Sequence, residues 1–395
     1  MKLSLTILIA LLFAWQQAAV GTPQADRQNQ NVAERGKDMP LGFIRPPGWS
    51  VIRHVSNEEM DRFTCPSDIE HVASNDPNDW IMARGEAGVK AERLAAPNEP
   101  SYHMCSDDGR YMFFIVQHFM VRPPNPPYRL YALNRRTLKL ELLQRSDTLV
   151  SINRFQPLSP LGHYLIGPPD APRSVNLPDG QKVTVISVSR DTPGSTPKYD
   201  ISAWAPDDSR LVLSSAAQLT VIDPSTGEAM ANTIGSASDI VLRSLRVEGS
   251  HLYVLADRQL PGGSSEYEVY EYLIDGLKLL DKRELMREPM STDRLEFGDG
   301  GIILVRRQVG KKLVFTPGAE FPEEVVAKGA REITYLHYPD GHEDPIFSTP
   351  YHAAVGGVGG CWFTESGKYV ACNVSRQRGS RDVLLVRREA GQEGR

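Results

Sequence analysis

The feature that most constrains the fold of this 395-residue chain is a short turn-and-strand motif that recurs along it. In each copy, polar or acidic residues lead to a glycine or serine, and an apolar run follows. Glycine at such a turn takes a positive φ, and the polar side chains bond to nearby backbone, so a strand must follow the turn. The four clearest copies are residues 105–113 (CSDDGRYMF), 158–166 (LSPLGHYLI), 205–213 (APDDSRLVL) and 363–371 (FTESGKYVA).

Weaker copies of the motif lie between the clear ones, at residues 76–81, 248–254 and 298–303. The glycine-equivalent positions are 78, 109, 162, 209, 250, 300 and 367, so successive copies are 31, 53, 47, 41, 50 and 67 residues apart. Most intervals match the roughly 40–50 residues of one propeller blade. The short first interval suggests a clipped blade, and the long last interval leaves room for an insertion or an extra blade.

A second apolar strand that ends in a turn recurs after the motif, at residues 130–134, 219–223 and 270–276. Each unit is therefore a meander of several strands and not a single hairpin. A sheet of this size cannot bury both of its faces alone, so the units must stack radially and close a ring. We predict an all-β protein with the β-propeller fold and seven four-stranded blades, with six or eight blades as alternatives.

Residues 203–227 resemble the TolB-type propeller repeats. Blades of that family carry a Ser-Pro-Asp-Gly-Lys-like turn before an apolar strand and a Val-Val-Asp…Gly third strand. Residues 203–212 read AWAPDDSRLV, and Asp223 and Gly227 end the third strand. The resemblance covers most of the chain from residue 70 to residue 390, strongly at four turns and weakly at three. It implies a WD-like propeller fold and no particular activity, because propellers host many unrelated functions.

The first residues have the pattern of a secretory signal peptide. Lys2 precedes an apolar run from Leu3 to Ala14, and small residues at 19–21 complete the cleavage pattern. We expect residues 1–21 to be the signal peptide and the polar residues 22–47 to be a flexible leader. The run is shorter than the roughly twenty residues of a membrane span, and a retained anchor is the alternative. We predict an exported protein, periplasmic or extracellular, without a membrane span after cleavage.

Residues 48–395 are expected to form a single propeller domain. Ser56 and Glu59 have the spacing of a capping box, which predicts a short helix near residues 57–63. Residues 49–53 alternate in the manner of a strand, and residues 382–386 are an apolar run of strand length. We therefore expect the two ends of the domain to share one blade.

Four cysteines in an exported chain favour disulfides, and Cys65, Cys105, Cys361 and Cys372 allow three pairings. Cys361 and Cys372 flank the turn 365–368. In a tight hairpin they would lie opposite each other, with Cα atoms about 4.5–5.5 Å apart, which is within disulfide reach. That pairing leaves Cys65 with Cys105. A shift of one residue in the turn would point the two side chains to opposite faces, so free thiols are the alternative.

Charge and motifs exclude several classes of function. The net charge of −5 and the pI of about 6.0 provide no global basic field, so we expect no nucleic-acid partner. The sequence contains no Gly-x-Ser-x-Gly, His-Glu-x-x-His, Walker or Rossmann motif. We expect no propeller peptidase, because the repeats leave no room in these 395 residues for a separate α/β domain. We therefore assign no catalytic residue and no cofactor.

The densest group of metal-capable side chains lies in residues 337–352. His337, His342 and His352 occur there among acidic residues. Imidazole and carboxylate ligands bind zinc, manganese or calcium when a fold gathers them. Their spacing matches no specific metal motif, and an exposed loop is the favoured interpretation. The three histidines are kept as candidates for a metal or acid–base site.

These observations favour a binding or scaffolding module that holds a protein or cell-envelope component on one rim or in the central channel, and we expect a monomer. Proline-rich residues 123–127 and 168–172 predict stiff rim loops. The alternative is an enzyme, such as a lyase, lactonase or hydrolase, with groups from several blades at the channel mouth. Ionisable side chains that converge at a channel opening would distinguish the two.

Overall fold

Strands dominate the computed structural model of the chain, as its short alternating runs require. The structure describes residues 42–61, 63, 65, 67–73, 101–117, 128–146, 157–167, 171–188, 201–215, 217–235, 240–260, 265–289, 292–314, 323–351, 360–374 and 382–389. Residues 44–395 form one unit, which holds every helix and strand described below. The residues expected to be the signal peptide lie outside the described ranges.

Helices are short. They are α2 (Asn57–Met60), α3 (Asp68–Ala73) and the 3₁₀ turn η2 (Asp299–Gly301). The side chain of Ser56 accepts a hydrogen bond from the Glu59 amide, and the Glu59 carboxylate accepts one from the Ser56 amide, which completes a capping box at α2. No local sequence pattern predicts α3. No helix in the described ranges is long and apolar enough to cross a membrane.

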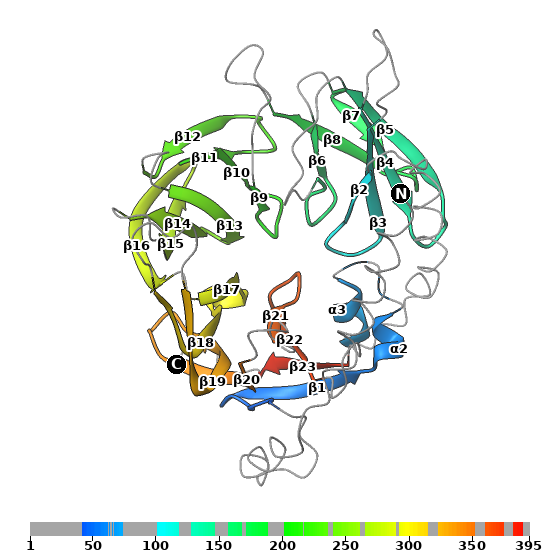
Figure 1. Ribbon diagram of the computed structural model, residues 1–395. Helices are drawn as coiled ribbons and strands as arrows, with labels where there is room; N and C mark the ends of the chain where they lie inside the picture. Colours follow the sequence, from blue (N-terminus) through cyan, green and yellow to red (C-terminus); the bar gives the residue numbers. More distant parts are fainter. Residues whose placement is uncertain are drawn as a thin grey trace, which may run out of the picture. The chain divides into compact units, whose positions relative to one another are not determined.

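The described strands form six sheets, five with four strands and one with three (Figure 1). The first two sheets contain β2 (Ser101–Cys105), β3 (Tyr111–Gln117), β4 (Tyr128–Asn134) and β5 (Leu140–Ser146), then β6 (Tyr164–Gly167), β7 (Ser174–Asn176) and β8 (Lys182–Ser187). The next two contain β9 (Ile201–Trp204), β10 (Leu211–Ser215), β11 (Gln218–Ile222) and β12 (Ala229–Thr233), then β13 (Ile240–Glu248), β14 (His251–Gln259), β15 (Ser265–Asp275) and β16 (Lys278–Pro289). The last two contain β17 (Thr292–Phe297), β18 (Ile303–Val314), β19 (Glu323–His337) and β20 (Glu343–Pro350), then β21 (Cys361–Phe363), β22 (Tyr369–Asn373), β23 (Val383–Arg388) and β1 (Trp49–Val55).

The meander order predicted from the repeats is confirmed in most sheets. The predicted second apolar strands are β4, β11 and β15, and each is third in an antiparallel four-stranded sheet. The β6–β8 sheet differs, because β6 pairs with β8 in parallel and β7 lies at the edge. Leu158 bridges Leu165 on the other side of β6, where an inner strand would lie. The all-β class is confirmed, whereas the total of seven blades stays a prediction.

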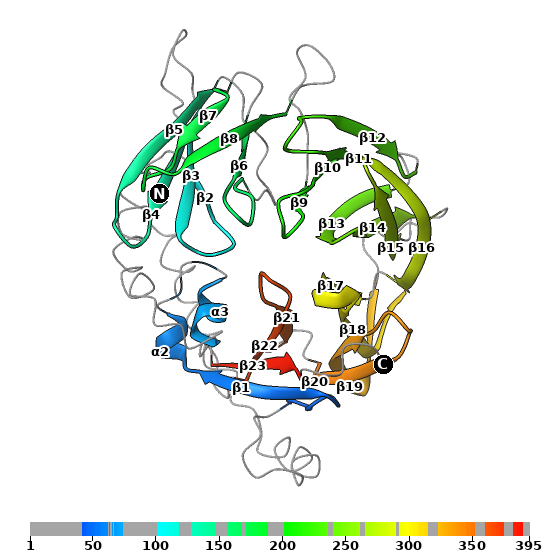
Figure 2. The same ribbon diagram turned by 180° about the vertical axis from the view of Figure 1, so that it is seen from behind.

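The two ends of the domain share one sheet, as the sequence predicted. β1 pairs antiparallel with β23 from Trp49 opposite Arg388 to Val55 opposite Val383. Figure 2 shows β1, in blue, beside β23, in red. The Trp49 indole also donates a 2.9 Å hydrogen bond to the Tyr338 hydroxyl of the preceding sheet. The last sheet is therefore completed by the N-terminal strand.

Two disulfides are present, and they follow the pairing that the turn between Cys361 and Cys372 favoured. Cys361 lies directly opposite Cys372 in the β21–β22 pair, with Cα atoms 4.0 Å apart. Cys65 is bonded to Cys105 at the end of β2, with Cα atoms 5.7 Å apart. The first disulfide lies within one sheet, and the second ties the segment before α3 to another.

The motif turns have the expected geometry, with one correction. Gly109, Gly162 and Gly367 have φ values of 67°, 76° and 74°. In the 205–213 copy, the positive φ of 61° belongs to Asp208, one residue before the aligned position 209. The Asp208 amide donates to the Ala205 carbonyl as the Gly109 amide donates to that of Ser106, so the two turns have the same length and Asp208, not residue 209, is the equivalent of Gly109. Aspartate tolerates this conformation better than most side chains.

Neighbouring sheets pack face to face in chain order. The β2–β5 and β6–β8 sheets share a buried cluster that includes Phe113 and Leu165, and later pairs of sheets share equivalent clusters. Between the β17–β20 sheet and the last one, the Phe363 ring lies so close to Gly298 that an added Cβ would meet it at 2.2 Å. Between the last sheet and the β2–β5 sheet lies α3, whose position determines the site described next.

Candidate functional site

Two of the histidines proposed as metal candidates lie where β19 meets β20. His337 ends β19, and its Nδ1 is 3.0 Å from a carboxylate oxygen of Glu343. Arg307 on β18 donates to the same carboxylate at 2.6 Å. These hydrogen bonds, first that of Arg307, lower the pKa of Glu343 although its burial acts in the opposite direction. Glu343 is therefore an ion-paired carboxylate.

His342 lies in the turn between the two strands and has other partners. Its Nδ1 is 2.7 Å from Asp340, and its ring stacks on Tyr338 with the ring centroids 4.0 Å apart. His352 lies outside the described residues. Within the part of the chain that the structure describes, no three His, Cys, Asp or Glu side chains are grouped so that they could hold a metal ion. His337 and His342 thus contact different carboxylates, Glu343 and Asp340.

A different set of ionisable groups gathers at the motif turns. In Figure 1 the turns after β2, β9 and β21, and the turn before β6, point toward the centre around which the sheets are arranged. We call these turns, the equivalent ones after β13 and β17, and Glu70 of α3 the inner-turn surface. It comprises Glu70 and residues 106–110, 159–163, 205–210, 248–250, 298–302 and 364–368, with eight Asp or Glu against three Lys or Arg. Such a surface attracts cations.

Asp208 links two of these turns. Its side chain is almost completely buried and accepts hydrogen bonds from the Ser159 hydroxyl at 2.6 Å and from the Leu161 amide at 2.9 Å. His163 Nδ1 lies 3.1 Å from the same carboxylate. Asp208 is the residue with a positive φ in its turn, and its carboxylate reaches the preceding turn. A residue of the motif therefore joins the β9–β10 turn to the turn before β6.

Three further turns are joined on the opposite side. The Glu248 carboxylate accepts a 3.0 Å hydrogen bond from the Gly300 amide of the next turn. Arg246, which also pairs with Glu248, donates to the Ser366 carbonyl at 2.6 Å. The Asp299 amide donates to the Gly367 carbonyl at 3.0 Å. The turns after β13, β17 and β21 are thus held in a fixed arrangement.

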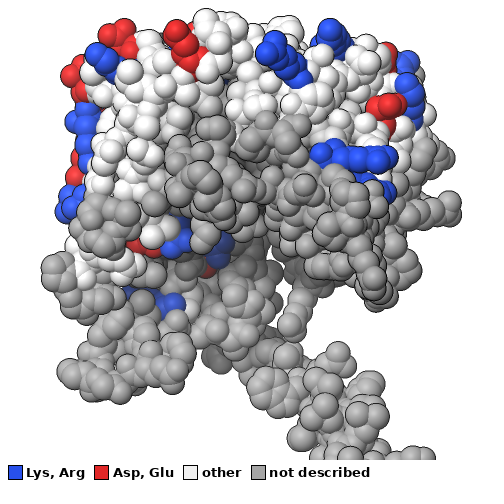
Figure 3. Space-filling view, turned by 90° about the horizontal axis from the view of Figure 1, so that it is seen from above, with Lys and Arg blue, Asp and Glu red and all other residues white. Residues whose placement is uncertain are grey.

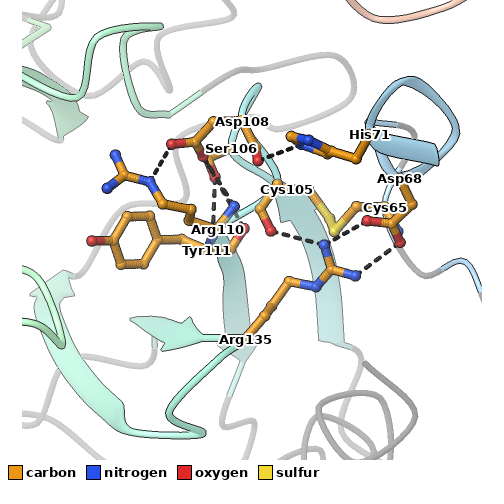
Figure 4. A network of polar contacts seen from close by, with 10 residues as sticks. Cys65, Asp68, His71, Cys105, Ser106, Asp108, Arg110, Tyr111 and Arg135 are labelled. Atoms are coloured by element: carbon orange, nitrogen blue, oxygen red, sulfur yellow. Dashed lines mark hydrogen bonds and ion pairs between the residues drawn. A yellow bond between two sulfur atoms is a disulfide. The ribbon is translucent and has the colours of Figure 1, made fainter. Parts of the chain in front are cut away.

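Helix α3 is tied to the β2–β5 sheet by a buried ion pair (Figure 4). Arg135, which follows β4, donates to both oxygens of Asp68 at 2.7 and 2.8 Å, and neither side chain is exposed to solvent. The same guanidinium donates to the Gly109 carbonyl in the β2–β3 turn at 2.8 Å. His71 Nε2 lies 2.8 Å from the Asp108 carbonyl. Together with the Cys65–Cys105 disulfide, these contacts attach α3 to that turn.

The other side of α3 contacts the last sheet. Ile69 packs in an apolar cluster with residues of β1, β22 and β23. Glu70 accepts a 2.7 Å hydrogen bond from the Ser366 amide in the β21–β22 turn. The helix therefore connects the first and last sheets, and it adds the carboxylate of Glu70 to the inner-turn surface.

Asp107 lies among the other carboxylates of this surface and is affected by several of them. Burial, followed by the negative charges of Glu365, Asp108, Glu70 and Asp208, raises the pKa of Asp107 to about 7. Carboxylates from α3 and from the turns after β2, β9 and β21 thus act on one group. Like charges near each other disfavour ionisation, and an opposite charge placed among them would restore it.

Tyr111, at the start of β3, links the β2–β3 turn to the β7–β8 turn. Its hydroxyl donates to Asp179 in a close hydrogen bond. Burial raises the pKa of Asp179, but this hydrogen bond and that from the Gln181 amide outweigh it, so the pKa is lowered overall. Gln181 also donates through its side chain to the Gly162 carbonyl at 2.8 Å. These contacts connect the first two motif turns.

The sequence named none of the carboxylates of the inner-turn surface as site residues. In the sequence, Asp107, Asp108, Asp207 and Asp208 belong to the turn motif and indicate turns only, and Glu70 lies on a six-residue helix that no local pattern predicts. Their common orientation toward one centre follows from the repeat, because each copy places its turn at the same end of its sheet. The repeat is therefore the sequence signal from which these carboxylates could have been recognised as one group.

Elsewhere the described surface is mixed in charge. On the face shown in Figure 3, Lys and Arg side chains lie near Asp and Glu side chains, with uncharged residues between them. Charged side chains of the described residues also form pairs, for example Arg283 with Glu271 and Arg287 with Glu284. The described part of that face therefore presents no field of a single sign.

Comparison with known proteins gives similarity to solved structures only, because neither a protein-family model nor a curated protein matches the sequence. One similar structure is dipeptidyl peptidase 4 of Porphyromonas gingivalis, with a TM-score of 0.37 and 11% identity over 72% of this chain and 50% of that one. This chain thus spans half the length of that peptidase.

Two other similar structures are closer to this chain in length. The putative TolB of Agrobacterium tumefaciens has a TM-score of 0.33 and 11% identity, over 74% of this chain and 91% of that one. The WD40 domain of SCAP from fission yeast has a TM-score of 0.34 and 12% identity, over 76% of each chain. The structures to which this chain is similar include TolB and WD40 propeller domains.

Proposed function

We propose that this protein is an exported binding or scaffolding module that holds a protein or cell-envelope component through a Lys- or Arg-rich segment of that partner. The segment binds at the inner-turn surface. The observation that carries the proposal is the gathering of carboxylates from α3 and three motif turns around Asp107, whose pKa is raised to about 7 by burial and by those charges. A cationic side chain placed there relieves their mutual repulsion.

The arrangement of the surface supports binding more than catalysis. The turns are held by contacts to one another, such as Asp208 with Ser159 and Glu248 with Gly300, so the carboxylates are positioned before a partner arrives. Preorganised charges lose little freedom on binding. Complementary charge also accelerates association and makes the affinity dependent on salt. The proposed ring, closed through α3, holds all of these turns at one end.

Export is supported by two features of the chain. Both disulfides are of the kind that persists in oxidising compartments, and they use all four cysteines. The N-terminal residues 1–21 have the composition of a signal peptide. The partner is therefore sought outside the cytoplasm.

The test is a binding titration with a fluorescently labelled oligolysine peptide at low ionic strength, with oligoglutamate as the control of opposite charge. We expect saturable binding of oligolysine alone, weakened by added salt. The double variant Asp207→Asn/Glu365→Gln removes two exposed carboxylates of the inner-turn surface. It is expected to bind about tenfold more weakly, since each exposed ion pair contributes a modest and similar amount.

The matched control removes two exposed carboxylates elsewhere, Glu58 on α2 and Glu228 in the β11–β12 turn. The Glu58→Gln/Glu228→Gln variant has the same net charge as the test variant and is expected to keep the affinity of the unaltered protein. Equal losses in the two double variants would show that only net charge matters. No binding of oligolysine at low salt would contradict the proposal outright.

A second function, an enzyme such as a lyase, lactonase or hydrolase with its site at the channel mouth, is favoured by one observation. A carboxyl group with a pKa near 7 is suited to general acid–base catalysis at neutral pH, and Asp107 is such a group. This function predicts turnover of an ester, lactone or glycoside substrate that Asp107→Asn abolishes. Unchanged turnover in that variant would exclude Asp107 as the acid–base residue.

A further inference from the structure

The two disulfides have different surroundings. Cys361 and Cys372 are both buried within one sheet and join neighbouring strands. Cys65 is buried, but Cys105 is partly exposed, and their bond joins the α3 segment to the end of β2. A thiol attacks a disulfide only where it can reach a sulfur atom, so access differs between the two bonds.

The two sides of α3 are held by different kinds of contact. Toward the last sheet, Ile69 packs with Val55, Ala371 and Leu385 in an apolar cluster. Toward the β2–β5 sheet, the links are the disulfide, the Asp68–Arg135 ion pair and the His71 contact to the β2–β3 turn. The apolar contact on this second side is made by Cys65 itself, which clusters with Met112, Phe114 and Leu133. The attachment of α3 to β2 therefore depends on Cys65 more than the attachment of α3 to the last sheet does.

The disulfide is also adjacent to the proposed binding surface. Cys105 directly precedes the β2–β3 turn, which contains Asp107 and Asp108. On the other side of the bond, α3 carries Glu70, which is hydrogen-bonded to the β21–β22 turn that contains Glu365. Movement of α3 away from β2 would separate Glu70 from Asp107.

We propose that the Cys65–Cys105 disulfide is a thiol-sensitive latch that regulates the inner-turn surface. While it is oxidised, it holds α3 against β2 and keeps the carboxylates together. When it is reduced, α3 separates from β2 and the cationic partner binds more weakly. This inference rests on the proposed function, because the ligand it regulates is the one assigned there.

The reaction is thiol–disulfide exchange with a dithiol reductant. A thiolate of the reductant attacks one sulfur of the Cys65–Cys105 bond and forms a mixed disulfide, and the other cysteine leaves as a thiolate that takes up a proton. The second thiol of the reductant then displaces the first cysteine. The protein gains two electrons and two protons as two thiols, and the reductant leaves as its own disulfide.

The experiment treats the folded, oxidised protein with increasing dithiothreitol, alkylates the thiols formed, maps them by peptide mass spectrometry and measures oligolysine affinity at each step. We expect Cys65 and Cys105 to be alkylated before Cys361 and Cys372. Affinity should fall at least about tenfold as the first bond is reduced, a loss well outside titration error. Reoxidation without alkylation should restore it.

Two variants separate the latch from a general loss of structure. Cys65→Ser/Cys105→Ser is expected to bind oligolysine as weakly as the reduced protein and to show no response to dithiothreitol. Cys361→Ser/Cys372→Ser is expected to bind like the unaltered protein while oxidised and still to lose affinity on reduction. Complete reduction of Cys65–Cys105 with unchanged oligolysine affinity would overturn the latch.

Failure of the proposed function is distinguishable from failure of the latch. If the oxidised protein does not bind oligolysine, the binding proposal fails, and amide hydrogen exchange then decides the latch. Faster exchange on reduction, confined to residues 67–73 and 101–110, would support release of α3 from β2. Unchanged exchange in both segments after complete reduction of that bond would overturn it.

Discussion

Arg135 and Asp68 form a charged pair that water does not reach. Burial of two charges costs several kcal/mol per ion, and only close geometry offsets it. Here the guanidinium makes two hydrogen bonds to the carboxylate and a third to the Gly109 carbonyl. Asp68 also accepts from the Cys65 amide at 3.0 Å. The pair therefore acts together with the Cys65–Cys105 disulfide to hold α3 against the β2–β5 sheet.

Replacement of Arg135 by methionine is predicted to destabilise the protein by about 3–5 kcal/mol, because Asp68 would remain buried as an uncompensated charge. The measurement is urea-induced unfolding followed by circular dichroism. The neighbouring residue Arg136 is exposed and offers a matched control, since Arg136→Met removes a guanidinium group that is not buried. Arg136→Met is expected to change stability by less than about 0.5 kcal/mol. Similar effects of the two variants would contradict the role given to the buried pair.

Asp107 makes stability depend on pH. Its pKa of about 7 in the folded protein lies above its ordinary value of 3.8, so the folded state holds the proton more tightly. The corresponding stabilisation is complete below about pH 4 and is lost as the pH rises through about 7. Asp107→Asn cannot ionise and should be more stable than the unaltered protein at about pH 8, by about 1 kcal/mol or more, the equivalent of one pKa unit. Near pH 4 this difference should vanish.

Asp207 is the control for this prediction, because its pKa is shifted in the opposite direction to that of Asp107. Hydrogen bonds from Ser209, first from its side chain and then from its amide, lower the pKa of Asp207. Its stabilisation is therefore present above the ordinary pKa and lost as the pH falls. Asp207→Asn should be less stable than the unaltered protein at neutral pH and not at low pH. Thermal unfolding of both variants across the pH range tests the two signs together.

At the scale of elements, α3 is held by contacts distant in sequence and not by helix propensity. It has six residues, fewer than a helix needs to be stable alone. The Cys65–Cys105 bond spans 40 residues, and closing a loop of that length stabilises the folded state by about 4 kcal/mol in the chain-entropy model. The helix is thus a connector that the two adjoining sheets hold in place.

The sequence predicted the elements that follow from local pattern. The second apolar strands of the repeat are β4, β11 and β15, and the alternating residues 49–53 do pair with the C-terminal strand. It did not predict α3, because the partners of that helix are Arg135 and Ser366, far away in the chain. It also did not predict the parallel β6–β8 pair, since register within a sheet depends on neighbours and not on composition.

For the whole molecule, the candidate site exists only after the sheets have assembled. No single copy of the motif contains more than two carboxylates, and the net charge of the chain is only −5. The repeat places every motif turn at the same end of its sheet, and α3 adds Glu70 where the first and last sheets meet. The acidity of the surface is therefore a property of the assembled sheets, and His337 and His342 contact other carboxylates, Glu343 and Asp340.

The most direct test of the account is the affinity of oligolysine for the unaltered protein as a function of pH. Lysine side chains stay charged throughout the neutral range, with an ordinary pKa of about 10.4, so the protein's own groups set the dependence. Because a bound cation favours ionised Asp107, affinity should rise about tenfold from about pH 6 to about pH 8, and Asp107→Asn should remove the rise. An affinity that is constant over this range, or greater at pH 6, would contradict the account.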